Sequence, residues 1–371
     1  MNHNKQWSSA LVSPYEQARE KENKIENLPM EIVGKIFDQI GEARHVVVAS
    51  ATCKMWRKVW KDYTCALSFN SNMYRDFHTS TFEVIITQTI FQTRGLKSLS
   101  IVMEYDHDDH QEYLSSELMV ACLMHTHDSL RQLHYSAKTT PNMNFINTLC
   151  SAQKLEDLVL SFVFIFGFNP SHHKFHNLKS LSLNYVTISP LNLSLILLTA
   201  CPKLETLVLV SLHIDKKTEL DLSNPSLKNF FVEDINMAKF IISKVDCLEN
   251  LHIKNCAIEF FKLVCKGALK TLEIDSSDLI NINIIGNTNN FESVDVYNST
   301  IMWSSIYSML IKKSSKIKRI KLCYVDFYEE DDEDIDMENL SSSTMALFMS
   351  MNNNNVMVLI GKSKEEFDLE N

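Results

Sequence analysis

One apolar phrase recurs along the chain and dominates its pattern of hydrophobic and polar positions. The phrase has the form L-x-x-L-x-L with apolar substitutes, as at residues 178–183, 204–209 and 248–253. The steps between successive starts are 34, 25, 23, 26, 23, 21, 21, 22 and 26 residues, which are periods of a repeat solenoid in all but the first case. The ten copies start at Leu96, Leu130, Leu155, Leu178, Leu204, Leu227, Leu248, Leu269, Phe291 and Ile317.

Each copy predicts a short strand whose leucines point inward while the residues between them point to solvent. Stacked copies form a parallel sheet on the concave face of a curved solenoid, and each unit buries its apolar face only against its neighbours. Helices are expected on the convex side where the repeats are long, notably at residues 191–200. The ninth position is mostly apolar. Only Cys256, with Ser277 and Ser299 as weaker donors, predicts a hydrogen bond there, so no continuous polar ladder is expected.

A second pattern precedes the repeats. Ile32, Val33, Ile36, Phe37 and Ile40 share one face of a predicted helix that Gly41 ends. A further predicted helix carries its apolar residues at Cys53, Trp56, Val59 and Trp60. A unit of this size struggles to fold alone, so we expect it to pack on a neighbour or a partner.

These patterns divide the chain into five parts. We expect a disordered tail at 1–24, a small helical unit at 25–69, a helical linker at 70–95, an α/β solenoid at 96–328, and a poorly capped tail at 329–371 that opens with an acidic run.

Composition narrows the function. The net charge is −10, but residues 329–338 hold eight acids and no base, so the rest is near balance at −2. A nucleic-acid binder carries a basic excess that this chain lacks. No stretch approaches the roughly 20 apolar residues of a membrane span. The nine cysteines form no C-x-x-C pair, which indicates buried thiols in a reduced protein of the cytoplasm or nucleus.

Candidate catalytic and metal-binding groups are few. Histidines cluster at His107 and His110 with His125 and His127, and again at residues 172–176. They lack supporting ligands at zinc spacing, so we interpret them as solvated loop residues and expect no metal and no cofactor. The chain has no G-x-S-x-G or H-E-x-x-H motif. A hydrolase that uses the histidines is kept only as a remote alternative.

Residues 25–69 resemble an F-box, on the basis of Leu28, Pro29, Glu31, Ile32, Ile36, Phe37, Ile40, Cys53 and Trp56. With ten leucine-rich repeats after it, and with the phrases at 48–57 and 85–93, the chain resembles a group of plant F-box/leucine-rich-repeat proteins.

The resemblance implies a non-catalytic subunit of a Skp–cullin–F-box ubiquitin ligase. Its F-box would bind a Skp-type adaptor of the cullin–RING core, and its repeats would capture an unknown protein substrate for ubiquitination. The alternative is a leucine-rich-repeat scaffold whose F-box binds the adaptor without assembling a ligase. The residues that would form or support the adaptor contact are Leu28, Pro29, Ile32, Ile36, Cys53 and Trp56. For Trp56, simple core packing is an equally good interpretation.

The outward strand positions are the natural surface for a substrate. Phe231 is unusual there because it is aromatic, although a shifted register would bury it and expose Phe230. The sign of the charge changes from Glu273 and Asp295 to Arg319 and Lys321, which we interpret as a solvated face neutralised by the acidic run. The candidate substrate-binding residues are His134, Asp157, Ser182, Asn229, Phe231, His252, Glu273, Asp295, Arg319 and Lys321.

Overall fold

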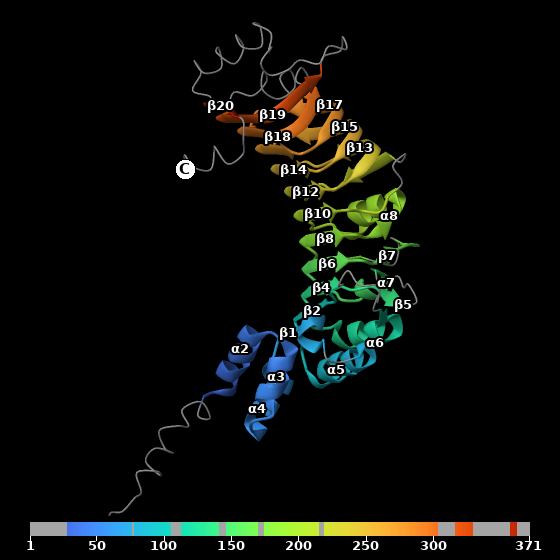
Figure 1. Cartoon of the computed structure of the whole chain (residues 1–371), viewed down its shortest axis with the longest axis vertical. Coiled ribbons are helices and arrows are strands. Elements are labelled where there is room, and N and C mark those ends of the chain that lie inside the picture. Colours follow the sequence, from blue (N-terminus) through green and yellow to red (C-terminus); the bar gives the residue numbers. More distant parts are fainter. Residues whose placement is uncertain are drawn as a thin grey trace, which may run out of the picture.

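Parallel strands stacked side by side line the inner wall of a curved arc, with a group of three helices at its amino end (Figure 1). This computed structural model describes residues 28–75, 78–104, 113–140, 146–169, 174–214, 219–302, 316–328 and 357–361. The α/β solenoid expected from the repeat is confirmed, since every strand pair in its main sheet is parallel and the sheet holds 16 strands.

The concave wall follows the sequence phrase closely. Each of its strands from β2 to β19 begins two residues after a phrase start, and the inward leucines are buried. Leu181 of β8 pairs in register with Leu207 of β10, which pairs with Phe230 of β12. The strands are β1 (Ala66–Asn70), β2 (Ser98–Val102), β4 (Gln132–Ser136), β6 (Asp157–Ser161), β8 (Ser180–Asn184), β10 (Thr206–Val210), β12 (Asn229–Glu233), β14 (Asn250–Lys254), β16 (Thr271–Asp275), β18 (Ser293–Met302), β19 (Arg319–Tyr328) and β20 (Met357–Gly361).

The convex side is helical in the first half of the arc. The predicted helix at 191–200 is confirmed as α8 (Pro190–Leu195) and the π-helical turn η2 (Ile196–Ala200), and Ser189 caps it by accepting a hydrogen bond from the Asn192 amide at 3.3 Å. The other elements on this side are η1 (Ser71–Tyr74), α5 (Thr79–Gln92), β3 (Leu114–Ser115), α6 (Ser116–Thr126), β5 (Thr139–Thr140), α7 (Ile146–Leu149), β7 (Phe164–Ile165) and β9 (Thr187–Ile188).

In the second half of the arc, strands replace the convex helices. The steps there are only 23, 21, 21 and 22 residues long, and in each of them the chain returns as an extended segment that pairs with its neighbours. The sequence pattern gave no sign of this second parallel layer. Its strands are β11 (Glu219–Ser223), β13 (Asn236–Ser243), β15 (Ala257–Lys266) and β17 (Asp278–Asn287).

A short polar ladder forms where the ninth position of the repeat is Cys or Ser. The Cys256 amide donates to Ser277 Oγ at 3.0 Å, and the Ser277 amide donates to Ser299 Oγ at 3.1 Å. In the preceding repeats Val186 and Ile235 are buried at this position. The expectation of an interrupted ladder is therefore confirmed for the described residues.

Two strands lie outside the predicted repeats. β1 is the first strand of the sheet, although Thr64 stands at the position where the other repeats have an apolar residue. The sheet therefore begins within residues 25–69, the range predicted to be the helical unit. β20 extends the sheet beyond β19 in a stretch where the sequence predicts no repeat. The tail at 1–24 and the acidic run lie outside the described residues.

The N-terminal helical unit comprises α2 (Met30–Ile40), α3 (Ala43–Ser50) and α4 (Lys54–Tyr63). Its apolar core is continuous with that of the sheet, and polar contacts add to this attachment. Asp38 Oδ1 accepts hydrogen bonds from the amides of Cys65 at 2.6 Å and Ala66 at 3.0 Å. The Ser68 amide donates to the Gly41 carbonyl at 2.8 Å, and Glu42 forms a parallel bridge with Ser68. The chain around Gly41 therefore covers the free edge of β1 and fixes the unit to the solenoid.

All nine cysteines are in the free thiol form. Burial raises the pKa of Cys122 and of Cys150 to about 12, which makes these thiols unreactive. Cys247 differs from the predicted core packing because it is exposed. Among the described residues, no helix combines the length and the apolar character that crossing a bilayer requires.

The Asp38→Ala variant should lose about 1–3 kcal/mol of the free energy of unfolding, because two backbone donors at the junction lose their acceptor. Urea unfolding and hydrogen exchange at the amides of Cys65 and Ala66 measure this loss. Asp38→Asn keeps an acceptor oxygen and serves as the control. Equal stability of the Ala and Asn variants would contradict the anchoring role.

Candidate functional site

An apolar stripe runs along the outer side of α2. Ile32, Ile36 and Ile40 are 41%, 37% and 36% exposed, whereas Val33 and Phe37 are fully buried. The sequence pattern put all five on one face, but the helix divides them into a buried edge and an open edge. Spacing of four residues places the three isoleucines in line, so α2 offers a row of branched side chains to a partner.

The ends of α2 set where the stripe starts and stops. The Pro29 carbonyl accepts from the amides of Ile32 at 2.9 Å and Val33 at 3.2 Å, and Pro29 itself is exposed. Leu28 is half-buried against the core. Gly41 ends the helix with a φ of 65° and donates to the Phe37 carbonyl at 3.0 Å. Leu28 and Pro29 thus lie at the end of the helix that begins the stripe.

Trp56 of α4 packs behind this helix. Its ring meets Phe37 edge-on, with centroids 5.5 Å apart and planes at 81°, and it is half-buried. Its indole Nε1 is buried and makes no hydrogen bond among the described residues. Cys53 caps α4, since its Sγ accepts from the Trp56 amide at 3.4 Å. Trp56 therefore packs against α2 from within, whereas Cys53 caps α4. The predicted adaptor contact of both residues stays a prediction.

Gly34 was missed by the sequence reasoning, although it decides how closely α2 and α4 approach. A β-carbon on Gly34 would lie 2.9 Å from Cβ of Tyr63 and 3.2 Å from the Tyr63 carbonyl oxygen. Only a residue without a side chain fits there. A glycine inside a strongly apolar helix is the one signal in the sequence that could have indicated a close contact.

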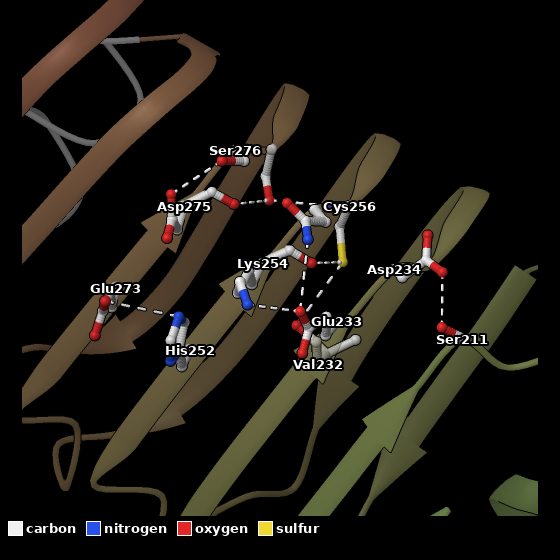
Figure 2. A network of polar contacts seen from close by, with 12 residues as sticks. Ser211, Val232, Glu233, Asp234, His252, Lys254, Cys256, Glu273, Asp275 and Ser276 are labelled. Atoms are coloured by element: carbon white, nitrogen blue, oxygen red, sulfur yellow. Dashed lines mark hydrogen bonds and ion pairs between the residues drawn. The ribbon is translucent and has the colours of Figure 1, made fainter. Parts of the chain in front are cut away.

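The concave wall presents the second surface. Phe231 is half-buried and faces the concave side, whereas Phe230 is 2% exposed in the core, so the register expected for this strand is the one observed. Phe231 meets the ring of His252 edge-on at 4.8 Å, and His252 Nε2 lies 3.7 Å from Glu273 Oε1 (Figure 2). β12, β14 and β16 thus bring together three predicted residues that lie about 20 residues apart in the sequence.

A row of amide and hydroxyl side chains runs beside these three residues. Asn250 Nδ2 donates to Asn229 Oδ1 at 2.7 Å, and Thr271 Oγ1 donates to Asn250 Oδ1 at 2.8 Å. Together the two rows line a shallow cavity of about 250 Å³. Asn229 was a predicted site residue, but the hydrogen-bonded row was not foreseen, because pairing across strands depends on the register.

The other predicted positions are spread along the wall. His134 is exposed near the amino end of the arc, and removal of part of its hydration lowers its pKa. Asp157 accepts from Gln132 Nε2 at 3.0 Å, and Ser182 donates to Asn184 Oδ1 at 3.1 Å. These side chains lie on the same face as Phe231 but belong to different repeats, so they form no single pocket with it.

Two residues predicted to contact a substrate are buried, so the prediction is wrong for them. Asp295 and Lys321 are each only 8% exposed. Arg319 holds Asp295 in a two-point ion pair, through Nε at 3.2 Å and Nη2 at 2.5 Å. Lys321 lies on β19 between β18 and β20 rather than at an edge. The countercharge for Arg319 therefore comes from the neighbouring strand, whereas the prediction assigned it to the acidic run.

A line of alternating charges marks the rim just before each concave strand, and the sequence reasoning overlooked it. Glu156 lies between Arg131 at 2.9 Å and Lys179 at 2.8 Å, and the hydrogen bond and charge of Lys179 lower the pKa of Glu156. The same pairing recurs at Lys228–Glu205, Lys270–Glu249 and Lys318–Glu292. Five bases pair with four acids along this rim, so most of its charge is satisfied within the protein and a net charge of 5 − 4 = +1 remains.

Comparisons with known proteins give the family. Residues 124–304 match a family model described as FBD-associated F-box protein At5g56370, LRR repeats. The chain is 44% identical over 324 residues to the F-box/LRR-repeat protein At1g67190 of Arabidopsis thaliana, which covers 86% of this chain and 75% of that protein. The chain belongs to the plant F-box/leucine-rich-repeat family. The resemblance drawn from its motifs is confirmed at the level of the family.

The histidine clusters gain no support as a metal centre. His125 lies in α6 rather than a loop and stacks on Phe91 at 4.6 Å. His127 bonds the Met124 carbonyl at 2.6 Å. Within the described part of the chain, no three metal-ligating side chains gather, and His107, His110, His172 and His173 lie outside it.

Gly34→Val should lower the free energy of unfolding by about 1–3 kcal/mol, because the added methyl groups force α2 away from Tyr63 in a well-packed unit. Thermal unfolding of the whole chain measures the loss. Gly95→Val is the control, because a β-carbon on Gly95 meets no atom within 4 Å. Any loss of stability in this control comes from the positive φ of 69° and not from a steric clash. A Gly34 variant as stable as the wild type would rule out the close contact.

Replacing Glu156 by Gln should remove a pH-dependent part of the stability. The pKa of Glu156 is lower in the folded chain than its usual value of 4.5, so its stabilising effect is present above pH 4.5 and disappears as the pH falls through the lowered pKa. The difference in unfolding free energy between wild type and Glu156→Gln, measured from pH 7 downward, should shrink toward zero in acid and in high salt. A difference that stays constant with pH would exclude the ion pairs as its cause.

Proposed function

We propose that this protein is the substrate-recognition subunit of a Skp–cullin–F-box ubiquitin ligase. The observation that carries the proposal is the stripe of Ile32, Ile36 and Ile40 that α2 leaves open to solvent. Aliphatic side chains in a row on a small helical unit are the anchors that a protein interface buries. An adaptor of the Skp type is the partner that F-box proteins bind, so the stripe is its docking surface.

The proposed contact centres on α2. Leu28 and Pro29 continue the stripe at the start of the helix, and Trp56 of the helix that Cys53 caps packs against Phe37 behind it. Burying three half-exposed isoleucines removes apolar surface from water at about 25 cal/mol per Å², which makes them the main source of affinity.

The role is non-catalytic. A ligase of this kind works by holding substrate lysines close to a charged ubiquitin-conjugating enzyme, which raises the effective concentration of the reacting groups. Fixed geometry matters for this purpose. The hydrogen bonds of Asp38 and Gly41 hold the F-box against β1, so the adaptor surface and the concave wall keep one orientation.

The concave wall is the proposed substrate surface. Phe231, His252 and Glu273 form its centre, flanked by the exposed amide of Asn229 and the half-buried amide of Asn250. His134, Asp157, Ser182 and Arg319 extend the surface along the arc. Asp295 and Lys321 are buried, so they do not contact the substrate and only pack beneath this surface.

The second candidate function is an interaction scaffold that binds the adaptor without assembling a ligase. The same stripe supports it, since the stripe fits the adaptor but carries no information about the cullin. The two functions differ only in whether cullin is recruited.

The test is co-purification of the full chain with a Skp-type adaptor and a cullin, beside an Ile32→Asp/Ile36→Asp variant. We expect wild type to retain both partners and the variant to bind the adaptor at least about 30-fold more weakly, since hot-spot residues contribute about 2 kcal/mol or more. Leu191→Asp is the matched control, because Leu191 is 69% exposed on α8 at the far side of the arc. Equal circular dichroism melting curves would show that the variants fold.

The outcomes separate the candidates. Adaptor binding without cullin would favour the scaffold. No adaptor binding by a folded wild-type chain would overturn both.

Phe231→Ala should weaken substrate capture while it leaves adaptor binding unchanged, because the ring is the central aromatic of the concave wall. Proteins labelled by a proximity-labelling fusion of the wild-type chain are quantified again with the variant. We expect a several-fold loss for the main substrates. Ile280→Ala, on the exposed side of β17, is the control and should lose none. Identical labelling by both variants would argue against the concave centre.

A further inference from the structure

Four polar side chains form one hydrogen-bonded row across the concave wall, which we call the amide row. The strands β10, β12, β14 and β16 pair in register at Thr206, Asn229, Asn250 and Thr271. Thr271 Oγ1 donates to Asn250 Oδ1 at 2.8 Å, and Asn250 Nδ2 donates to Asn229 Oδ1 at 2.7 Å. Asn229 Nδ2 then donates to Thr206 Oγ1 at 3.4 Å, which ends the row.

The two asparagines use only half of their hydrogen-bonding capacity within the row. A primary amide has two N–H donors and an oxygen with two lone pairs. Asn229 and Asn250 each use one donor and one lone pair in the row, and no other described residue bonds to their side chains. Turning both amides over reverses the direction of the row and leaves the same groups unused. Each asparagine therefore offers one N–H and one carbonyl lone pair to a ligand.

Both amides line the cavity of about 250 Å³ that Phe231 and His252 also line. Asn229 is exposed and Asn250 is half-buried, so a ligand reaches both. The cavity is smaller than the roughly 300–1,000 Å³ of a small-molecule pocket, so it suits side chains that project from a partner protein. The half-buried ring of Phe231 gives an aliphatic stem an apolar surface to cover.

The unused groups match a second side-chain amide. A glutamine carries an N–H and a C=O side by side, so it can accept from one asparagine and donate back to it in a two-point contact. A carboxylate only accepts and an ammonium only donates, so each makes half of this contact. A trans peptide unit points its N–H and C=O in opposite directions and also makes only half. A polar site rejects a ligand that leaves its hydrogen-bonding groups unpaired.

The spacing of the two asparagines indicates the conformation of the partner. Asn229 and Asn250 pair on adjacent strands, about 4.8 Å apart. Side chains four residues apart on an α-helix have β-carbons about 5–6 Å apart. Side chains on one face of an extended segment lie about 6.6–6.8 Å apart. A helical segment therefore fits the row more closely than an extended one.

We propose that the concave wall recognises a helical segment of the substrate through two glutamines four residues apart. One glutamine pairs with Asn229 and the other with Asn250, and an aliphatic stem covers the Phe231 ring. This inference rests on the proposed function, because it names the kind of substrate that the concave wall captures.

The test uses the full chain and a fluorescently labelled, alanine-based helical peptide of about 17 residues with Gln at its positions 7 and 11. Fluorescence anisotropy should show saturable binding to the wild-type chain. Three control peptides of equal length should bind at least about 10-fold more weakly. They carry Glu at both positions, Met at both positions, or Gln at positions 7 and 9, which face different sides of the helix.

The variant Asn229→Thr/Asn250→Thr removes both amides and keeps a hydroxyl at each position. Threonine suits a strand and already stands at both ends of the row, so this variant should melt at the wild-type temperature. It should bind the peptide with Gln at positions 7 and 11 at least about 10-fold more weakly than wild type. Asn281→Thr is the matched control and should bind normally, because Asn281 is an exposed asparagine on β17 in the convex layer.

A second measurement does not depend on how the variants fold. The NMR signals of the side-chain amides of Asn229 and Asn250 in wild type should shift when the peptide binds. Bound peptide with unshifted signals would overturn the inference. So would the absence of saturable binding to wild type, equal binding of the two glutamine spacings, or equal binding by wild type and the double variant.

Adaptor binding by the same preparation separates this inference from the proposed function. A chain that retains the adaptor but not the peptide would overturn the glutamine-bearing substrate and leave the ligase role in place. A chain that binds the peptide but not the adaptor would support the amide contact and overturn the ligase role.

Discussion

The inward leucines of each repeat can be buried only by the repeats on either side, and every other feature of this protein depends on that stacking. Leu181, Leu207 and Leu251 are almost completely buried, although no repeat has a core of its own. Stacking fixes the parallel register, and the register in turn places each outward side chain beside its counterparts. It also leaves two ends at which a sheet edge and an apolar face need a cover.

The N-terminal helical unit covers the amino end of the sheet and is fixed in position by doing so. The carboxylate of Asp38 and the carbonyl of Gly41 satisfy backbone amides around β1 that would otherwise face water. The same helix that supplies Asp38 presents Ile32 and Ile36 outward. Anchoring therefore uses one side of α2 and leaves the opposite side open for the proposed adaptor contact, on a unit too small to fold alone.

The repeat also decides which positions are free to acquire function. Inward positions are fixed by packing, and rim charges such as Glu156 and Lys179 pair with each other. Variation is left to the outward positions of the concave strands. Phe231 stands out there because its aromatic ring lies among polar side chains such as Asn229 and Asn250. Equivalent positions in successive repeats have the same backbone, so a side chain that differs from its equivalents there indicates a functional requirement.

The sequence by itself determined the repeat, the ten predicted strands, the helix at 191–200 and the family, because apolar spacing and motif residues are local properties of the chain. It also indicated that Phe231 faces outward. It could not determine the convex strands, the burial of Asp295 and Lys321, or the pairing of Asn229 with Asn250, since each depends on which strand lies next to which. Asp38 and Gly34 follow the same rule. Their roles arise from contacts across repeats or between helices, and only the tertiary structure decides which residues meet there.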